Sequence, residues 1–142
     1  MFDHLGFRVR DLAAARKFYD AVAASLGLST IDNTETSFLL SRSAEALVPF
    51  VWIGTGKPDF WRDGHRTAQS PLHLAFTANS KHAVDAFHKA ALENGGADNG
   101  APGPRGPAEM QYYGAYVIDP DGNNIEAGFR GSEWPPRRME AG

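Results

Sequence analysis

Two histidines and one glutamate stand where they could together hold a metal ion. His4 lies in the stretch DHLGFRVRD, His73 in PLHLAF and Glu126 in NNIEAGF. Two neutral imidazoles and one carboxylate bind divalent first-row metals and leave coordination positions free for water or a substrate. Because these ligands suit several such metals, the candidates are iron, manganese, nickel, cobalt and zinc.

The stretch around His4 is predicted to be a half-buried strand. In DHLGFRVRD, apolar residues alternate with His4, Gly6 and Arg8, and successive side chains of a strand point to opposite faces of a sheet. The apolar face should pack against a following helix, so His4 points to the other side. Arg8 shares that side, where it could hold an anionic part of a substrate or simply reach solvent at the strand end.

The segment that begins at His4 recurs about half a chain later. HLGFRVRDLAAARKFYDAVAASLG aligns without gaps to HLAFTANSKHAVDAFHKAALENGG, which begins at His73. The matches, such as Gly27 with Gly96, fall at expected strand, helix and stop positions. We interpret the two segments as copies of one supersecondary unit. Two sheets related by a pseudo-two-fold would bring His4 and His73 towards one another.

Each copy is expected to contain a strand, a helix and two short strands, with room for one more. The first strands are expected at about 3–9 and 72–78, and the helices follow the N-cap residues Asp11 and Ser80. The later strands are predicted in TSFLLS, VPFVWIG, YYGAYVID and NNIEAGF. Two Gly- and Pro-rich segments, GTGKPDFWRDGHRTAQSP and GGADNGAPGPRGP, are predicted to be long loops.

The 142 residues have the length of one ordinary domain, so we expect a single domain over 1–142. Within it, the repeat divides the chain into two halves of similar length. The predicted boundaries are module one at about 1–57, a linker at about 58–70, module two at about 71–131 and a C-terminal tail at 132–142.

Glu126 lies among apolar neighbours, where an ionised carboxylate is costly unless it is paired or binds a cation. The preceding DPDGN segment predicts a tight turn between two strands. Such a hairpin places Tyr116 across from Glu126 on the same face of the sheet. A phenol beside a metal can hydrogen-bond a bound oxygen or act as an acid, although Tyr116 could also simply pack.

These segments resemble the vicinal oxygen chelate superfamily, which includes glyoxalase I, extradiol ring-cleaving dioxygenases, and fosfomycin and bleomycin resistance proteins. The resemblance rests on HLGFRVRD with its following helix, on PLHLAF and on YVIDPDGNNIE, and it covers about residues 3–130. It implies an α+β fold of two βαβββ modules with a pseudo-two-fold repeat, which form an incomplete barrel around a metal site. It also implies metal ligands at His4, His73 and Glu126, with Tyr116 and Glu126 as catalytic residues.

The resemblance implies a metal-dependent enzyme acting on a small substrate that chelates the metal through vicinal oxygens, as a glyoxalase-like lyase or isomerase or as a dioxygenase. Glyoxalase I has a fourth protein ligand near the end of its first module, where this chain has VPFVWIG, without a carboxylate or imidazole. This departure favours a site with three protein ligands. Arg8, Trp52 and Tyr113 are the expected substrate-binding residues, and the aromatic ones suit a flat or apolar substrate.

A second hypothesis is a non-catalytic protein of the bleomycin-resistance type, which binds and sequesters a small molecule. Such proteins typically lack the metal ligands. The presence of all three ligand candidates in this sequence favours the enzyme over the sequestering protein.

The net charge, the lengths of apolar runs and the cysteine content limit which partners and compartments are expected. The formal net charge of -3 argues against a nucleic-acid partner, which usually requires a clustered basic face. No apolar run approaches the roughly 20 residues of a membrane-spanning helix, and the absence of cysteine fits a reducing compartment. We therefore expect a cytoplasmic protein with a small-molecule substrate and no membrane partner. By resemblance to the family, we expect a homodimer.

Overall fold

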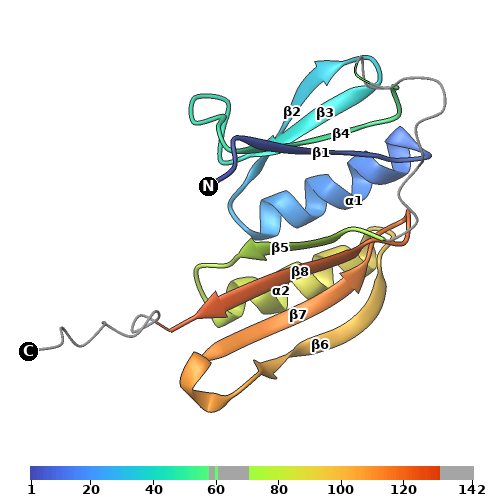
Figure 1. The fold of residues 1–142 in the computed structure, drawn as a ribbon. Coiled ribbons are helices and arrows are strands. Elements are labelled where there is room, and N and C mark those ends of the chain that lie inside the picture. The colour runs from blue at the N-terminus through green and yellow to red at the C-terminus, as the bar shows by residue number, and fades with distance from the viewer. Residues whose placement is uncertain (58–59, 61–70, 132–142) are drawn as a thin grey trace, which may run out of the picture.

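The computed structural model describes residues 1–57, 60 and 71–131, which form two modules of the same βαβββ plan (Figure 1). Module one consists of β1 (His4–Arg8), α1 (Leu12–Ser25), β2 (Ser29–Thr34), β3 (Ser37–Ser41) and β4 (Phe50–Gly54). Module two consists of β5 (His73–Thr77), α2 (Lys81–Glu93), β6 (Ala97–Arg105), the short 3-10 helix η1 (Ala108–Met110), β7 (Tyr112–Ile118) and β8 (Asn124–Arg130). The predicted α+β fold of two repeated modules is confirmed.

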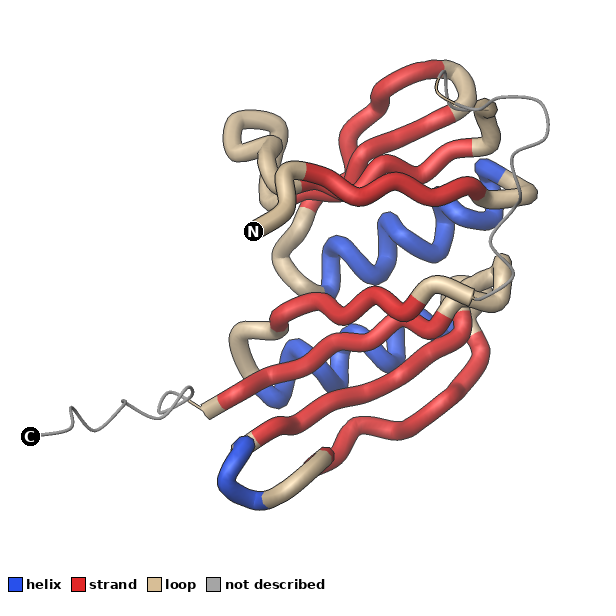
Figure 2. The backbone as a smooth tube through the Cα atoms, viewed as in Figure 1, coloured by secondary structure: helices blue, strands red, loops and turns tan. Residues whose placement is uncertain are grey.

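Each module folds into one four-stranded mixed sheet. The strand orders are β1-β4-β3-β2 and β5-β8-β7-β6, so the first strand of each module is an edge strand beside its last. These two neighbouring strands run parallel, whereas the other pairs are antiparallel. The two sheets have the same topology and neither closes into a barrel (Figure 2).

Both helices begin and end at the residues that the sequence predicts. The side chain of Asp11 accepts a hydrogen bond from the Ala14 amide at 3.0 Å, and Ser80 caps α2 in the same way. Gly27 follows α1 in the left-handed region, with φ of 68°, which glycine adopts without steric cost. Within the described residues, no helix is long and apolar enough to cross a membrane.

The hydrophobic core lies on the helix side of each sheet. α2 is behind β8 in Figure 1, and α1 and α2 also contact one another. The largest fully buried side chains come from both helices and from the strand faces toward them; they include Phe18, Phe38, Ile53, Phe87 and Ile125. The opposite face of each sheet has no helix over it among the described residues, and we call it the open face of that module.

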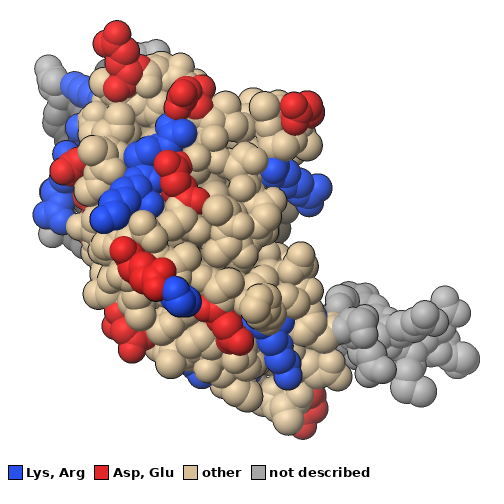
Figure 3. Space-filling view, turned by 180° about the vertical axis from the view of Figure 1, so that it is seen from behind, with Lys and Arg blue, Asp and Glu red and all other residues tan. Residues whose placement is uncertain are grey.

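The side of the molecule seen from behind carries acidic and basic side chains close together (Figure 3). On α1, Arg16 pairs with Asp20, and on α2, Lys89 pairs with Glu93, each one helical turn apart. Such pairs are typical of a solvated helix surface and contribute little to stability individually.

The segment GGADNGAPGPRGP contains a strand rather than only a loop, so that prediction was wrong. β6 occupies nine of its residues and pairs with β7 despite two prolines, Pro102 and Pro104. Proline lacks an amide donor and is therefore tolerated only where one side of a strand is unpaired, as at this sheet edge. β2 is the additional short strand for which the sequence leaves room.

The predicted linker at about 58–70 and the predicted tail at 132–142 lie outside the described residues, apart from residue 60. The strands predicted at the module starts, in the later segments and across the DPDGN turn are all present. In that turn, Gly122 has a φ of 91°, a backbone conformation that glycine tolerates and other residues rarely adopt.

A buried hydrogen bond joins the two modules. Tyr19 on α1 is fully buried and donates from its hydroxyl to Asp119 Oδ2 at 2.6 Å, in the turn between β7 and β8. Asp119 is only 4% exposed and also accepts hydrogen bonds from the amides of Asp121 and Asn123. At the rim of this contact, Arg10 donates to Asp121. The turn of module two is thereby held against the helix of module one.

Replacing Tyr19 with phenylalanine should lower the free energy of unfolding by about 1–3 kcal/mol, because the buried Asp119 carboxylate loses a donor. Urea unfolding followed by circular dichroism measures this change. Tyr113→Phe is the matched control, since its hydroxyl donates to Asp85 at the surface. Equal unfolding midpoints for the Tyr19 variant and the unmodified chain would show that the contact does not hold the modules together.

Candidate functional site

The open face of module two carries three of the candidate site residues, His73, Tyr116 and Glu126. The strand register aligns Tyr116 on β7 with Glu126 on β8 and Ala75 on β5, so these three residues share one side of the sheet. Their neighbours Ala115 and Ile125 are fully buried on the other side, toward α2. Strand alternation therefore places Tyr116 and Glu126 on the face that no described helix covers.

Glu126 and His73 meet on this face. Nε2 of His73 lies 2.9 Å from Oε2 of Glu126. The Glu126 side chain is 8% exposed, whereas that of His73 is 58% exposed. Two ligands at right angles around one metal, each bonded at about 2.1 Å, are separated by about 3 Å. The donor types and their spacing therefore fit two ligands of a single divalent metal.

Tyr112 holds the second oxygen of Glu126. Its hydroxyl donates to Oε1 of Glu126 at 2.5 Å, so the carboxylate has a partner on each oxygen. Burial, and next the hydrogen bond to Glu126, raise the pKa of Tyr112 well above its ordinary value. The hydroxyl is therefore protonated and able to donate at neutral pH. Tyr112 was not among the site residues predicted from the sequence, although it lies on the same face of β7 as Tyr116.

Tyr116 lies opposite Glu126, as the predicted hairpin requires. Burial, and next the negative charge of Glu126, raise the pKa of the Tyr116 phenol above its ordinary value. The guanidinium of Arg105, from β6, lies over the Tyr116 ring at 5.4 Å from its centre. A protonated phenol thus stands beside the carboxylate on the same face.

Glycine makes room for the two tyrosine rings. A Cβ added to Gly128 would lie 1.8 Å from the Tyr112 hydroxyl oxygen, and one added to Gly100 would lie 2.7 Å from the Tyr116 ring. Real Cβ contacts are never that short, so both rings lie directly on positions that carry no side chain. The glycines of β6 and β8 therefore determine how these tyrosines are arranged around Glu126.

A pocket of about 430 Å³ adjoins this group at the end of β5 and β8. Ala75, Thr77, Gly128 and Arg130 contribute to its walls, together with Tyr112. Because Tyr112 also contacts Glu126, the pocket and the Glu126–His73 pair share one wall. A small molecule that contacts the pair could extend into this space.

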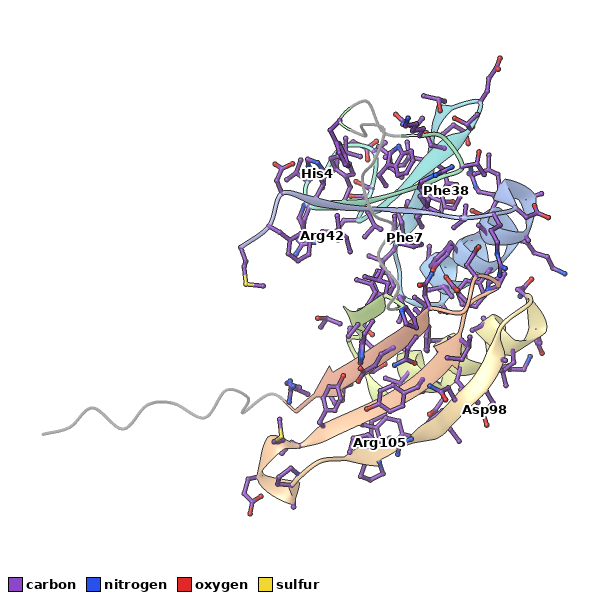
Figure 4. All side chains as sticks on the ribbon, turned by 45° about the vertical axis from the view of Figure 1, so that its right-hand side comes forward. His4, Phe7, Phe38, Arg42, Asp98 and Arg105 are labelled. Atoms are coloured by element: carbon purple, nitrogen blue, oxygen red, sulfur yellow. The ribbon has the colours of Figure 1, made fainter. Side chains whose placement is uncertain are left out.

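His4 lies on β1 of module one (Figure 4), whereas His73 and Glu126 lie in the sheet of module two. Its ring stacks on Phe50 at 4.9 Å between centroids, and its Nδ1 lies 2.7 Å from Asp3 Oδ1. No group of three metal-binding side chains forms among the described residues. The expected approach of the two histidines therefore does not occur within one chain. The physical reason is that the helix contact and the Tyr19–Asp119 hydrogen bond fix the modules in another arrangement.

The structure divides the predicted substrate-binding residues between separate places. Trp52 lies on the open face of module one, where its ring covers Gly54. Arg8 is on the same face and donates to the Thr55 carbonyl at 2.9 Å. Tyr113 points to the opposite side of its sheet from Tyr112, and its hydroxyl donates to Asp85 of α2 at 2.8 Å. The fold thus brings neither module-one residue to Glu126 and turns Tyr113 away from it.

A comparison with protein-family models identifies the superfamily of this chain. Residues 1–127 match the model of the Glyoxalase/Bleomycin resistance protein/Dioxygenase superfamily. The match covers most of the chain and both modules, so this chain belongs to that superfamily. A search of curated proteins found no match.

Solved structures agree with this membership. The chain is similar to a glyoxalase/bleomycin resistance protein from Albidiferax ferrireducens T118, with 33% identity and a TM-score of 0.68 over 92% of this chain and 98% of that one. It shares its fold with a glyoxalase/bleomycin resistance protein/dioxygenase family enzyme from Burkholderia phytofirmans PsJN, with 18% identity and a TM-score of 0.65 over 91% and 98% of the two chains. A glyoxalase-related enzyme from Fulvimarina pelagi has 17% identity and a TM-score of 0.67 over 92% and 88%.

Replacing Glu126 with glutamine should lower the pKa of Tyr112 and Tyr116 toward the ordinary value of 10.0, because the nearby negative charge disappears. Tyrosinate absorbance near 295 nm, followed as pH rises, reports these ionisations. In the unmodified chain, the stability gained from protonated phenols is complete below pH of about 10 and is lost as pH rises through the raised pKa values.

An identical titration in the Glu126→Gln variant would contradict the electrostatic contact between Glu126 and the two tyrosines. Tyr113 supplies an internal reference, because its raised pKa arises from its hydrogen bond to Asp85 and not from Glu126. Its contribution to the absorbance change should be the same in both proteins.

Proposed function

We propose that this protein is a metal-dependent enzyme that acts on a small substrate chelated through vicinal oxygens. The observation that supports it is the Glu126–His73 pair, a buried carboxylate 2.9 Å from an imidazole on the open face of module two. Its metal would be divalent iron, manganese, nickel, cobalt or zinc, because imidazole and carboxylate ligands suit each of them. The reaction class is a glyoxalase-like lyase or isomerase, or a dioxygenase.

His73 and Glu126 would hold the metal, and His4 would supply the third ligand. When bound, the metal acts as a Lewis acid toward the substrate oxygens. Tyr116 lies on the same face, and its raised pKa keeps the phenol protonated, so it can donate a hydrogen bond or a proton to a substrate oxygen. The adjoining pocket accepts the remainder of the substrate.

We propose that the third ligand comes from a second copy of the chain, in a homodimer. Each copy presents His4 on the open face of module one and the Glu126–His73 pair on the open face of module two. A two-fold axis would place module one of each copy against module two of the other, because a two-fold contact always occurs twice. Each dimer would then contain two complete sites.

Metal binding tests the proposed ligands directly. The chain purified without chelators should bind one divalent ion per copy, and Glu126→Gln should weaken binding by at least about 100-fold, since even partners of ligands account for 10- to 100-fold. Isothermal titration with Mn²⁺, Co²⁺ and Zn²⁺ measures the affinities. Glu109→Gln is the matched control, because Glu109 is exposed in η1 and away from the pair. A chain that binds none of these ions would exclude the proposed function, and ligand binding unaffected by chelators would favour a sequestering protein.

Complementation between variants tests the shared site. His4→Ala and Glu126→Gln should each remove tight metal binding from their own homodimers. A heterodimer of the two variants, purified through a different tag on each chain, should recover about half of the sites of the unmodified dimer. Recovery requires that His4 of one copy meets Glu126 of the other. Heterodimers without any recovered metal would show that the site is not shared between copies.

A further inference from the structure

We propose that Tyr112 is a positioning residue that keeps one Glu126 oxygen away from the metal. This inference rests on the proposed function, because it assigns how the Glu126 ligand is presented. The Tyr112 hydroxyl donates to Oε1, while Oε2 is the oxygen beside His73 Nε2. The two oxygens of the Glu126 carboxylate therefore have different partners. Oε1 accepts the hydrogen bond from the Tyr112 phenol, and Oε2 is free to bind the metal beside His73 Nε2.

The Tyr112 ring is fixed in place from two sides. Gly128 lies beneath the hydroxyl end, where any Cβ would overlap the ring, and Gly114 leaves space for its edge. The guanidinium of Arg130 lies over the ring at 4.3 Å from its centre. These contacts favour the ring position in which the Tyr112 hydroxyl meets Glu126. The Tyr112–Glu126 hydrogen bond is thus built into the sheet rather than made by a freely moving surface side chain.

Binding of Glu126 through one oxygen would leave more coordination positions of the metal open to a substrate. If three protein ligands each supplied one atom to the metal, coordination positions would remain open for the oxygens of a substrate. A Glu126 that bound through both oxygens would remove one of these positions. By holding Oε1, Tyr112 preserves the position and also withdraws charge from the carboxylate, as partners of metal ligands do.

Tyr116 is the second tyrosine that interacts with Glu126. It lies directly opposite Glu126 in the strand register, and its ring lies on Gly100 and under Arg105, on the β6 side. Tyr112 approaches from the other end of β7, across Gly128. The two tyrosines therefore approach Glu126 from different directions.

Co²⁺ binding to the full-length chain tests the proposal, because the visible spectrum of Co²⁺ reports the number and geometry of its ligands. Tyr112→Phe should change the Co²⁺ spectrum and weaken Co²⁺ binding about 10-fold, the effect expected when a partner of a metal ligand is removed. Tyr113→Phe makes the same chemical change at the adjacent residue, on the other side of the sheet, and should leave both the spectrum and the affinity as they are.

Gly128→Ala provides a second, independent variant. Its methyl group would displace the Tyr112 ring while keeping the hydroxyl in the protein, and it should therefore alter the Co²⁺ spectrum in the same direction as Tyr112→Phe. If Gly128→Ala does not fold, the Co²⁺ spectrum of Tyr112→Phe alone tests the positioning role of Tyr112.

An unchanged Co²⁺ spectrum in Tyr112→Phe would overturn the proposal, whatever happens to the affinity, because a merely structural role could change affinity alone. Failure of the proposed function itself would be seen in the unmodified chain. If that chain binds no Co²⁺, Mn²⁺ or Zn²⁺, the proposed function itself is wrong, and the positioning role of Tyr112 is excluded with it.

Discussion

The architecture depends on one constraint: within the described residues, each four-stranded sheet has one α-helix to cover it. The helix side holds the buried aromatic and aliphatic residues, and burial of that apolar surface is the main favourable contribution to folding. The other face is left for polar and aromatic side chains. Because successive residues of a strand alternate between the two faces, β7 and β8 carry core residues and candidate site residues in turn.

The contact between modules is equally important for the site. Helix packing and the buried Tyr19–Asp119 hydrogen bond set the two sheets so that, among the described residues of one chain, His4 does not join the Glu126–His73 pair in a group of three metal-binding side chains. The acidic turn that follows β7 thus has two consequences. It closes the hairpin that places Tyr116 beside Glu126, and its buried carboxylate fastens that hairpin to α1. Site geometry and module arrangement are linked through this turn.

Side chains that lie flat on glycine recur on both open faces. Tyr112 covers Gly128, Tyr116 covers Gly100, and in module one the Trp52 ring covers Gly54. A bulkier residue at any of these positions would push the aromatic ring away from the sheet. Glycine is usually unfavourable within a strand, because it has no side chain to pack and loses more conformational freedom on folding. At these positions it allows a large ring to lie close to the backbone.

Local pattern alone determined the repeat, the helix caps and the faces on which His4, His73 and Glu126 lie, because periodicity and capping act over a few residues. It also determined that Tyr116 opposes Glu126, since a short turn fixes strand register. Only the tertiary structure showed that the Pro-containing β6 pairs at an edge, that Tyr112 reaches Glu126 across Gly128, and that His4 remains apart from His73. These features depend on contacts between residues far apart in the chain, above all between the two modules, and no local pattern encodes how two modules pack.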